Sequence, residues 1–515
     1  MKKNIFILFL LTFNLGVQGQ KLQLEEIMKG DGFIGNQPSN QRWSLDGQKI
    51  YFDWNPKNEI GTSTYFVDKN NIKPQLVNAK ESEFSKLNFL KKPNSNTAYF
   101  VNKGALYSYT IKEKVTKKLI QQGSAISNLQ LASEEGVLFF EQNDNMMKFN
   151  TKNGTLVQLS NFKAGKAAKE ETEADSFLKT QQKELFVFIR DQEASKKWYK
   201  DKSDELKSDF PKEYFYGKNN IQSLKANPNG NYLTFNAVEP KDLKSEKMEV
   251  FITSDGYNKS PDTKRKVSVD NLNPIKFGVY SIIKDSVYYL NFSKLSHLKD
   301  TPEYYKLYDN LKDKEKTDKL IYVQEPTYND SGSLAITEIR SQDNKDRWIV
   351  KLNLAEGTFE EIDYQHDEAW IGGPGIPSNT YGSGTLGFLA DNSTIYYQSE
   401  VTGYSHLYTY NVNTKKKQQL TSGNWEVRDV ILAKDKKIFY LTTTTTHPGN
   451  RNLYKLAVAD AKLQPLLTKD GAYETSLSPD ESKLLIRYSY KNKPWELFVA
   501  DNKQNPIQVF DHSRI

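Results

Sequence analysis

The chain contains no cysteine among its 515 residues. Disulfide bonds, thiolate metal sites, lipid anchors on cysteine and cysteine nucleophiles are therefore all excluded. Long apolar runs are also missing after the first residues, since no later stretch approaches the roughly 18 uninterrupted apolar residues that a membrane helix needs. The mean hydropathy of −0.71 agrees with this. We therefore expect no membrane anchor.

Basic residues are not concentrated in any one part of the sequence. The formal net charge is +7, from 71 Lys and Arg against 64 Asp and Glu. Nucleic-acid-binding proteins gather their Lys and Arg on one face or along one helix, whereas here both signs are scattered. The sequence therefore predicts no nucleic-acid partner, and we interpret the excess charge as a contribution to solubility.

The sequences of catalytic and ligand-binding loops are missing as well. The nucleophile elbow of α/β serine hydrolases, G-x-S-x-G, is absent, and the nearest string, Tyr381-Gly382-Ser383-Gly384, has the wrong spacing. Phosphate-binding glycine motifs and zinc-binding His patterns do not occur, and Asn143-Asp144-Asn145 matches only part of a calcium loop. We therefore expect no catalytic residue, no metal and no cofactor in this chain.

The first residues have the pattern of a secretory signal peptide. Two lysines after Met1 precede an apolar run from Ile5 to Phe13, which is too short to span a bilayer. A small-x-small site at Val17-Gln18-Gly19 follows. Cleavage there removes residues 1–19 and leaves Gln20 at the start of an N-terminal segment, residues 20–40. This pattern predicts a periplasmic or secreted protein.

The rest of the sequence is rich in aromatic residues and repeats. It contains 30 Tyr and 27 Phe, which favour strands because they suit a pleated, half-buried surface. A polar turn followed by three short strands recurs at a period of about 40 to 50 residues, which is typical of propeller blades. Nine turns begin such a unit: Trp43–Gly47, Pro93–Asn96, Glu134–Gly136, Asn227–Gly230, Lys284–Asp285, Asn329–Gly332, Asp391–Asn392, Lys434–Asp435 and Ser478–Asp480.

These repeats predict an all-β fold, a β-propeller of seven or eight blades over residues 41–515. Asp-Gly, Asn-Gly and Ser-Gly pairs supply the positive φ angles that tight hairpin turns need. A sandwich of many strands is the alternative, although sandwiches do not repeat their turns and aromatic strands at this period.

One charged segment, residues 161–218, interrupts the repeats and is expected to be an insert. It is rich in Lys, Glu, Asp and Gln and has few strand signals. Leu178, Leu185, Phe188 and Ile189 fall on one face at helical spacing, which predicts an amphipathic helix against the propeller edge. We interpret the charge of the insert as a solvated surface.

The most suggestive polar cluster is His366-Asp367-Glu368, followed by Trp370. A His with two carboxylates can bind a cation or orient the amino group of a substrate. The same residues can equally form a hydrogen-bonded loop between two blades. We therefore take these four residues as candidate substrate-binding residues. The alternative, that they only form a hydrogen-bonded loop between two blades, stays open.

Three segments of the last third resemble the N-terminal propeller of the dipeptidyl peptidase IV family. These are Gln398–Tyr408, Gln419–Val427 and His447–Tyr454. The segments Leu22–Ile27, Ser254–Tyr257 and Asp367–Gly375 resemble exported bacterial members of the same prolyl-oligopeptidase family.

The resemblance implies a propeller that caps a C-terminal α/β-hydrolase domain with a Ser, Asp and His triad. Its funnel would admit only short or unfolded peptides. The chain ends at Ile515, about where that domain should begin, so we expect the hydrolase domain to be absent from this chain. Members of the family also hold the substrate's amino terminus with a paired Glu motif after an aromatic segment. Glu170-Glu171 lacks that aromatic lead, and the role is not transferred to it.

Three functional hypotheses follow. The first is a substrate-gating propeller of an exported serine peptidase, with a peptide substrate and a hydrolase domain as partners and no activity of its own. The second is a stand-alone periplasmic binding propeller, a receptor or scaffold for peptides or glycans. The third is a hydrolase built on the propeller itself, with acidic residues in its channel. Homodimerisation is left open.

Overall fold

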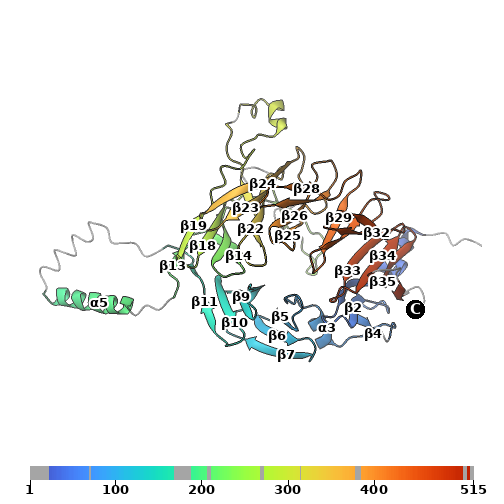
Figure 1. Ribbon diagram of the computed structural model, residues 1–515, viewed down its shortest axis with the longest axis horizontal. Coiled ribbons are helices and arrows are strands. Elements are labelled where there is room, and N and C mark those ends of the chain that lie inside the picture. The colour runs from blue at the N-terminus through green and yellow to red at the C-terminus, as the bar shows by residue number, and fades with distance from the viewer. Residues whose placement is uncertain are drawn as a thin grey trace, which may run out of the picture. The chain divides into compact units, whose positions relative to one another are not determined.

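The computed structural model describes residues 23–68, 71–166, 187–205, 210–266, 272–313, 315–376, 384–502 and 507–510. The expected signal peptide lies outside these ranges. Most of the described chain is strand, and eight antiparallel sheets follow one another along it (Figure 1). They are the blades of an eight-bladed β-propeller, which confirms the predicted all-β class and settles the blade count at eight.

The chain divides into two compact units. The first unit, residues 1–82, 475–502 and 506–515, contains the first blade and the last blade except for the first three residues of its strand β33. Blade 1 consists of β1 (Ser39–Trp43), β2 (Lys49–Trp54), β3 (Ser63–Asp68) and β4 (Gln75–Leu76), and blade 8 of β33 (Ala472–Leu477), β34 (Lys483–Tyr490), β35 (Lys493–Asp501) and β36 (Ile507–Phe510).

The second unit, residues 83–474 with 503–505, contains the other six blades. Blade 2 consists of β5 (Thr97–Asn102), β6 (Ala105–Thr110) and β7 (Val115–Ile120). Blade 3 consists of β8 (Ser127–Leu131), β9 (Val137–Gln142), β10 (Asn145–Asn150) and β11 (Leu156–Gln158). Blade 4 consists of β14 (Asn220–Ala226), β15 (Tyr232–Val238), β18 (Ile275–Ser281) and β19 (Ser286–Tyr289).

Blade 5 consists of β20 (Ile321–Val323), β21 (Thr327–Tyr328), β22 (Ala335–Ser341), β23 (Asp346–Asn353) and β24 (Thr358–His366). Blade 6 consists of β25 (Leu386–Phe388), β26 (Thr394–Ser399), β27 (His406–Asn411) and β28 (Lys417–Gln419). Blade 7 consists of β29 (Val427–Leu432), β30 (Ile438–Thr443), β31 (Asn452–Ala457) and β32 (Leu463–Leu467).

The apolar side chains of the strands form clusters between neighbouring blades. One cluster joins Phe235 of blade 4 to Phe139 of blade 3, and another joins Trp348 of blade 5 to Val279 of blade 4. In the first unit, Phe52 of blade 1 packs in the same cluster as Leu485 of blade 8. Because neighbouring sheets cover it on both faces, a strand can be buried along its whole length, as in β22, where every residue is buried although four of the seven, Thr337, Glu338, Arg340 and Ser341, are polar or charged.

Two of the repeated polar turns share the same pair of side-chain hydrogen bonds. In blade 1 the Ser44 hydroxyl donates to Asp46 Oδ1 at 2.6 Å and accepts the backbone N–H of Lys49 at 2.9 Å. In blade 8 Ser478 makes the same two bonds, to Asp480 at 2.6 Å and from Lys483 at 3.0 Å. Such side-chain bonds to the backbone favour turns over continued strand. These turns join the first and second strands of their blades.

One of the nine predicted blade starts is wrong. Lys284–Asp285 lies in the turn between β18 and β19, inside blade 4, and opens no new sheet. Asp285 has φ of 46° and is followed by an aromatic strand, so its local chemistry matches that of a blade-opening turn. The strand that follows the turn distinguishes a turn inside a blade from a turn that opens one: here it is β19, which pairs with β18 as the fourth strand of blade 4.

The predicted insert contains a helix, α5 (Val187–Glu205), and begins and ends at a pair of parallel strands, β12 (Asn161–Lys163) and β13 (Glu213–Phe215). Leu178 and Leu185 lie outside the described residues, as do the side chains of Phe188 and Ile189. The described helical side chains, residues 191–202, are exposed except for one that is half-buried. The expected packing against the propeller edge is therefore not seen in this part of the helix.

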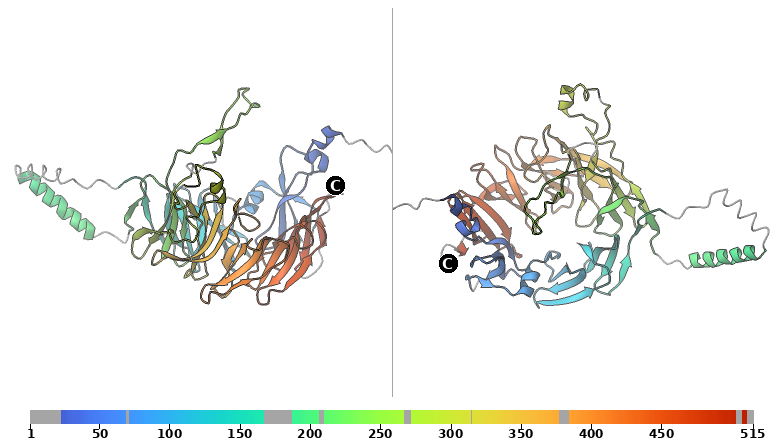
Figure 2. Two further views of the ribbon diagram at one scale, coloured as in Figure 1. Left: turned by 90° about the horizontal axis from the view of Figure 1, so that it is seen from above. Right: turned by 180° about the vertical axis from the view of Figure 1, so that it is seen from behind.

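A second extension leaves blade 4 between β15 and β18 as a hairpin of β16 (Ser245–Lys247) and β17 (Asp262–Arg265). Figure 2 shows this hairpin extending away from the sheets of its unit. The remaining helices are short: α1 (Leu24–Ile27), α2 (Asp31–Ile34), α3 (Ala79–Ser85) and the 3-10 helix η2 (Glu303–Leu307). No helix among the described residues is long and apolar enough to cross a membrane.

Candidate functional site

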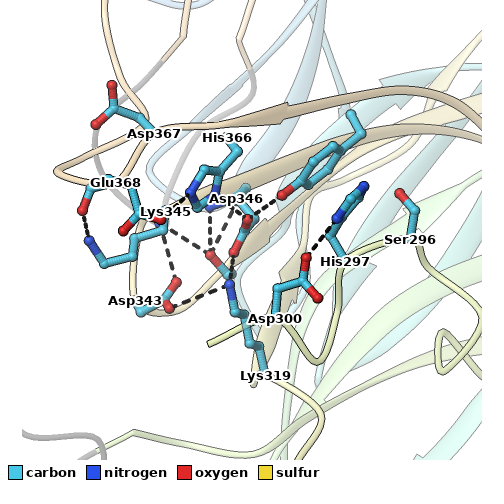
Figure 3. A network of polar contacts seen from close by, with 12 residues as sticks. Ser296, His297, Asp300, Lys319, Asp343, Lys345, Asp346, His366, Asp367 and Glu368 are labelled. Carbon is cyan, nitrogen blue, oxygen red and sulfur yellow. Dashed lines mark hydrogen bonds and ion pairs between the residues drawn. The ribbon is translucent and has the colours of Figure 1, made fainter. Parts of the chain in front are cut away.

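The predicted site residues lie where blade 5 ends and the chain passes to blade 6. His366 is the last residue of β24, and Asp367, Glu368 and Trp370 follow in the loop. His366 lies between two carboxylates: its Nδ1 is 2.7 Å from Asp346 Oδ1 and its Nε2 is 3.1 Å from Glu368 Oε1 (Figure 3). The structure thus brings His366 and Glu368, two of the candidate residues, into contact.

Asp346 is the centre of this polar network. Its carboxylate is fully buried at the start of β23, accepts a hydrogen bond from Tyr364 at 2.8 Å, and pairs with Lys319. Burial lowers the pKa of His366, but its hydrogen bonds to Asp346 and Glu368 raise it more, so the pKa lies above its ordinary value. The two carboxylates therefore favour the protonated form of His366, which bridges them.

Two further residues extend the network on the side of Tyr364. The ring of His297 stacks on Tyr364 with centroids 4.3 Å apart and 12° between the planes. His297 Nδ1 is 2.7 Å from Asp300 Oδ2 (Figure 3). Sequence reasoning missed this contact, because His297 lies in the segment between blades 4 and 5, Tyr364 lies in β24 of blade 5, and no motif links them.

The other predicted residues shape the loop itself. Asp367 Oδ1 accepts the backbone N–H groups of Ala369 and Trp370, both at 2.7 Å, so this carboxylate caps its own turn rather than joining His366. These bonds, that from Trp370 first, lower the pKa of Asp367 despite its partial burial. Glu368 Oε2 accepts the backbone N–H of Glu303 at 3.0 Å, which ties the loop to the start of η2.

Exposed aromatic side chains lie on both of these connected segments. Trp370 is 57% exposed, Tyr304 41% and Tyr308 55%. The Nζ of Lys345 lies 5.8 Å from the centroid of the Tyr304 ring and also bonds the backbone carbonyl of Glu368. Aromatic faces beside charged groups are a common composition of peptide- and sugar-binding surfaces.

Below the loop lies a charged cluster that sequence reasoning missed. Glu338 and Arg340 of β22 and Arg347 of β23 are all fully buried. Arg347 Nη2 is 2.7 Å from Glu338 Oε2, and Arg347 Nη1 donates to the carbonyl of Gln398 in blade 6 at 2.8 Å. Arg340 Nη2 donates to the carbonyl of Ile371 at 2.5 Å. The loop is therefore anchored on buried charges.

The glycine-rich part of the loop packs directly on blade 6. Gly373 has φ of 154°, and a Cβ there would lie 1.9 Å from Glu400 Oε1. A Cβ on Gly375, whose φ is 71°, would lie 1.9 Å from Gln398 Oε1. Both positions therefore require glycine. Burial first, and then repulsion from Glu426 and Asp367, raise the pKa of Glu400 to about 6.

The carboxylates and aromatic rings around His366 can hold the positively charged or hydrogen-bonding groups of a ligand. Among the described residues, no group of three or more His, Asp or Glu is placed to hold a metal ion. Residues 377–383, which contain most of the Tyr381–Gly384 string, lie outside the described part. Asn143-Asp144-Asn145 forms the hairpin turn between β9 and β10, where Asn143 and Asp144 have φ of 51° and 60°. That turn accounts for its sequence without a calcium ion.

His406 is a buried, hydrogen-bonded residue of blade 6. It is 1% exposed, and its ring nitrogens lie 3.0 Å from the Thr421 hydroxyl and 3.0 Å from the carbonyl of Gly423. Burial lowers the pKa of His406. The ring is therefore neutral at neutral pH and acts as a hydrogen-bonding core residue of blade 6.

Comparisons with known proteins place these blades in a family. Residues 290–495 match the family model described as the dipeptidyl peptidase IV N-terminal region, and this stretch contains the whole polar network. Dipeptidyl peptidase 4 of Arthroderma otae is 32% identical over 115 residues, which are 22% of this chain and 15% of that protein. Dipeptidyl peptidase 4 of Trichophyton equinum is 30% identical over 132 residues, 24% of this chain and 17% of that protein.

The same fold occurs in a solved structure. The crystal structure of Porphyromonas gingivalis dipeptidyl peptidase 4 superposes with a TM-score of 0.51 at 13% identity, and the match covers 94% of this chain and 60% of that one. The chain thus matches less than two thirds of the length of each of these relatives. With eight blades in order along the sequence, the chain contains an N-terminal propeller domain of the dipeptidyl peptidase IV family.

Proposed function

We propose that this propeller controls the access of peptides to the catalytic domain of an exported serine peptidase and supplies no nucleophile itself. The observation that carries the proposal is the match of residues 290–495 to the dipeptidyl peptidase IV N-terminal region. A rigid ring of blades excludes folded proteins by size, and polar groups on it orient an entering peptide before a lid or domain closes.

The polar network at the end of blade 5 is the candidate for this orientation. Glu368 pairs with His366, Glu400 lies against Gly373 of the same loop, and the exposed ring of Trp370 also belongs to this loop. A peptide with a free amino group would bind its charge to the carboxylates and pack its side chains on the aromatic rings. An acetylated peptide offers no such charge.

Binding assays on the chain test this role. A fluorescent pentapeptide with a free amino terminus should bind the chain, and its N-acetylated form should bind about ten-fold more weakly, because one charge-assisted hydrogen bond is lost. Glu368→Gln should remove the difference, whereas Glu135→Gln, an exposed carboxylate in blade 3, should keep it. Equal affinity for the two peptides in the parent chain would contradict the assignment of the site.

Activity assays test the claim that the nucleophile lies elsewhere. The chain from Gln20 onward should not hydrolyse chromogenic dipeptide and prolyl substrates. Turnover that a serine-directed inhibitor abolishes would overturn this claim. The coding sequence after Ile515 gives an independent check, since an in-frame G-x-S-x-G region favours a peptidase and a stop codon favours a binding propeller.

Export is part of the same proposal and depends on the signal-peptide pattern of residues 1–19. Expression of the chain with this leader in a Gram-negative host should give a periplasmic product that begins at Gln20. N-terminal sequencing checks the cleavage site, and replacement of the apolar run by polar residues should leave the product in the cytoplasm.

A stand-alone binding propeller is the second candidate, and the exposed aromatic residues Tyr304, Tyr308 and Trp370 favour it. Aromatic platforms of this kind also bind sugars, so a glycan array separates the two functions. Tight binding to a glycan, together with no preference between free and acetylated peptides, would favour the receptor.

A further inference from the structure

A pocket of about 540 Å³ lies in the first unit, between blades 1 and 8. Its lining comes from β1, β2 and β3 on one side and from the β33–β34 turn and β35 on the other. Volumes of roughly 300 to 1,000 Å³ are typical of sites for small organic molecules. The pocket therefore has the size of a ligand site, and it is separate from the network at the end of blade 5.

The floor of the pocket is apolar. Trp43, Ile50, Val67 and Val499 line it and belong to the cluster that joins the two blades. The indole N–H of Trp43 is buried and has no acceptor among the described residues. Ile72, which is 61% exposed, adds an apolar side chain at the mouth. An apolar ring or chain of a ligand would therefore leave water on entering.

The rim of the pocket is acidic. Two of its carboxylates, Asp46 and Asp480, belong to the equivalent Ser-x-Asp turns of blades 1 and 8. These turns lie against each other, because a Cβ on Gly47 would come within 3.2 Å of the Pro479 ring. The hydrogen bond from Ser478, which is the largest effect, holds the pKa of Asp480 below its ordinary value, so this carboxylate is ionised at neutral pH.

Two more carboxylates and one cation complete the lining. Asp68 lies at the end of β3 and Asp501 at the end of β35, while Lys483 is the one basic residue of the lining. Four carboxylates against one ammonium give the lining a formal charge of −3. No group of three or more acidic or His residues in the described chain is arranged for a metal ion. The rim is therefore suited to a larger, organic cation.

We propose that this pocket binds a small organic cation with an apolar body, an amine or guanidinium carried on an aromatic or aliphatic group. The apolar body would lie on Trp43, Ile50 and Val499, and the cationic group would lie at the carboxylate rim. Such a ligand contacts both blades at once. It therefore stabilises the seam between the first and last blades of the propeller by binding only when they are packed.

The first experiment uses three probes that separate charge from apolar body. Tryptamine carries both, indole-3-propionate carries the ring with the opposite charge, and methylamine carries the charge alone. Isothermal titration of the chain should give binding of tryptamine at millimolar or lower concentration. The other two probes should bind at least about ten-fold more weakly, because each lacks one of the two matched features.

Variants of the rim then test the site. Asp480→Asn with Asp501→Asn should weaken tryptamine binding by about ten-fold or more, since each lost carboxylate removes attraction at short range. Asp480→Asn keeps a side-chain oxygen that accepts the Ser478 hydroxyl, and Asp501 is exposed, so both substitutions leave the fold intact. Glu135→Gln serves as the matched control, because it removes an exposed carboxylate outside the pocket. Tryptamine should also raise the melting temperature of the parent chain and not of the double variant.

Several outcomes would overturn the proposal. One is the absence of tryptamine binding up to 10 mM, roughly the weakest affinity such a pocket should give. Equal binding of indole-3-propionate would exclude the role of the acidic rim, and equal binding of methylamine would exclude the role of the floor. Unchanged tryptamine affinity in the double variant would place its binding elsewhere on the chain.

Discussion

At the scale of single residues, the buried charges of blade 5 are the least expected feature of the chain. Glu338 and Arg347 are fully buried and 2.7 Å apart. A charge in this position is tolerated only while its partner is present, because the protein interior cannot solvate it. The pair therefore fixes one arrangement of β22, β23 and the loop after β24 rather than adding much net stability.

This predicts a large effect of removing one partner. Arg347→Met should lower the free energy of unfolding by roughly 3 kcal/mol or more, because Glu338 loses its closest counter-charge. Urea unfolding followed by circular dichroism measures this. The double variant with Glu338→Gln should lose less than Arg347→Met alone. As a control, Arg428→Met removes a more exposed pair with Glu426 at 3.7 Å and should cost at most about 1 kcal/mol.

Glu400 gives a pH-dependent prediction. Its pKa is raised to about 6 by burial and by Glu426 and Asp367, from an ordinary value of 4.5. The native state therefore holds this proton more tightly than the unfolded chain, and the stability that this contributes is present below pH 4.5 and lost as pH rises through about 6. Glu400→Gln should then gain about 1 kcal/mol relative to the parent at pH 8 and nothing at pH 4.5.

The measurement is the free energy of unfolding of both proteins at several pH values between 4.5 and 8. Glu113→Gln, which removes an exposed carboxylate of blade 2, should show no such trend. A constant difference between Glu400→Gln and the parent across this range would contradict the raised pKa.

At the scale of elements, the hairpin of β16 and β17 carries apolar residues that the propeller does not cover. Phe251 is 70% exposed, Ile252 94% and Tyr257 77%. Exposed apolar groups gathered on one extension are typical of a protein-protein contact. We therefore expect the homodimer that the sequence left open to form through this hairpin.

Phe251→Ser with Ile252→Ser should give a monomer at concentrations where the parent is a dimer, because the apolar area that drives association is removed. Sedimentation velocity measures the two states. Ile283→Ser removes an equally exposed apolar residue from a turn of blade 4 and should leave the dimer intact. A parent chain that is monomeric at micromolar concentration would refute the dimer.

The blades could be predicted from the sequence because their turns are local. Ser44 and Asp46 lie two residues apart, and their bonds form within one turn. The same local reading gave a wrong prediction at Lys284–Asp285, where a polar turn before an aromatic strand joins the third and fourth strands of blade 4. The candidate residues His366 and Glu368 are likewise close in the sequence, two positions apart, and they are in contact in the structure.

The rest of the site could not be predicted in this way. Asp346 lies 20 residues before its partner His366, and Arg347 bonds a carbonyl in the next blade. Such contacts depend on strand register and on the packing of one sheet against another. Nothing in the local sequence around Asp346 or Arg347 indicates that neighbouring sheets bury these charged residues completely.

At the scale of the whole molecule, the chain consists of two compact units, and the first is built from both ends of the sequence. Leu485 of blade 8 packs in one cluster with Phe52 and Trp54 of blade 1. The first unit thus forms only after the last residues of the domain are available. Contacts of such sequence separation are costly to close, so we expect this unit to fold after the six central blades.

Two core substitutions test this division. Leu485→Ala in the first unit and Leu407→Ala in the second each remove a side chain that is at most 1% exposed, so each should cost roughly 2 to 5 kcal/mol. In scanning calorimetry, Leu485→Ala should lower one transition and Leu407→Ala the other, because the two residues belong to different units. If both substitutions shift a single transition by the same amount, the domain unfolds as one cooperative body and the ends of the chain close the propeller in the same step as the central blades form.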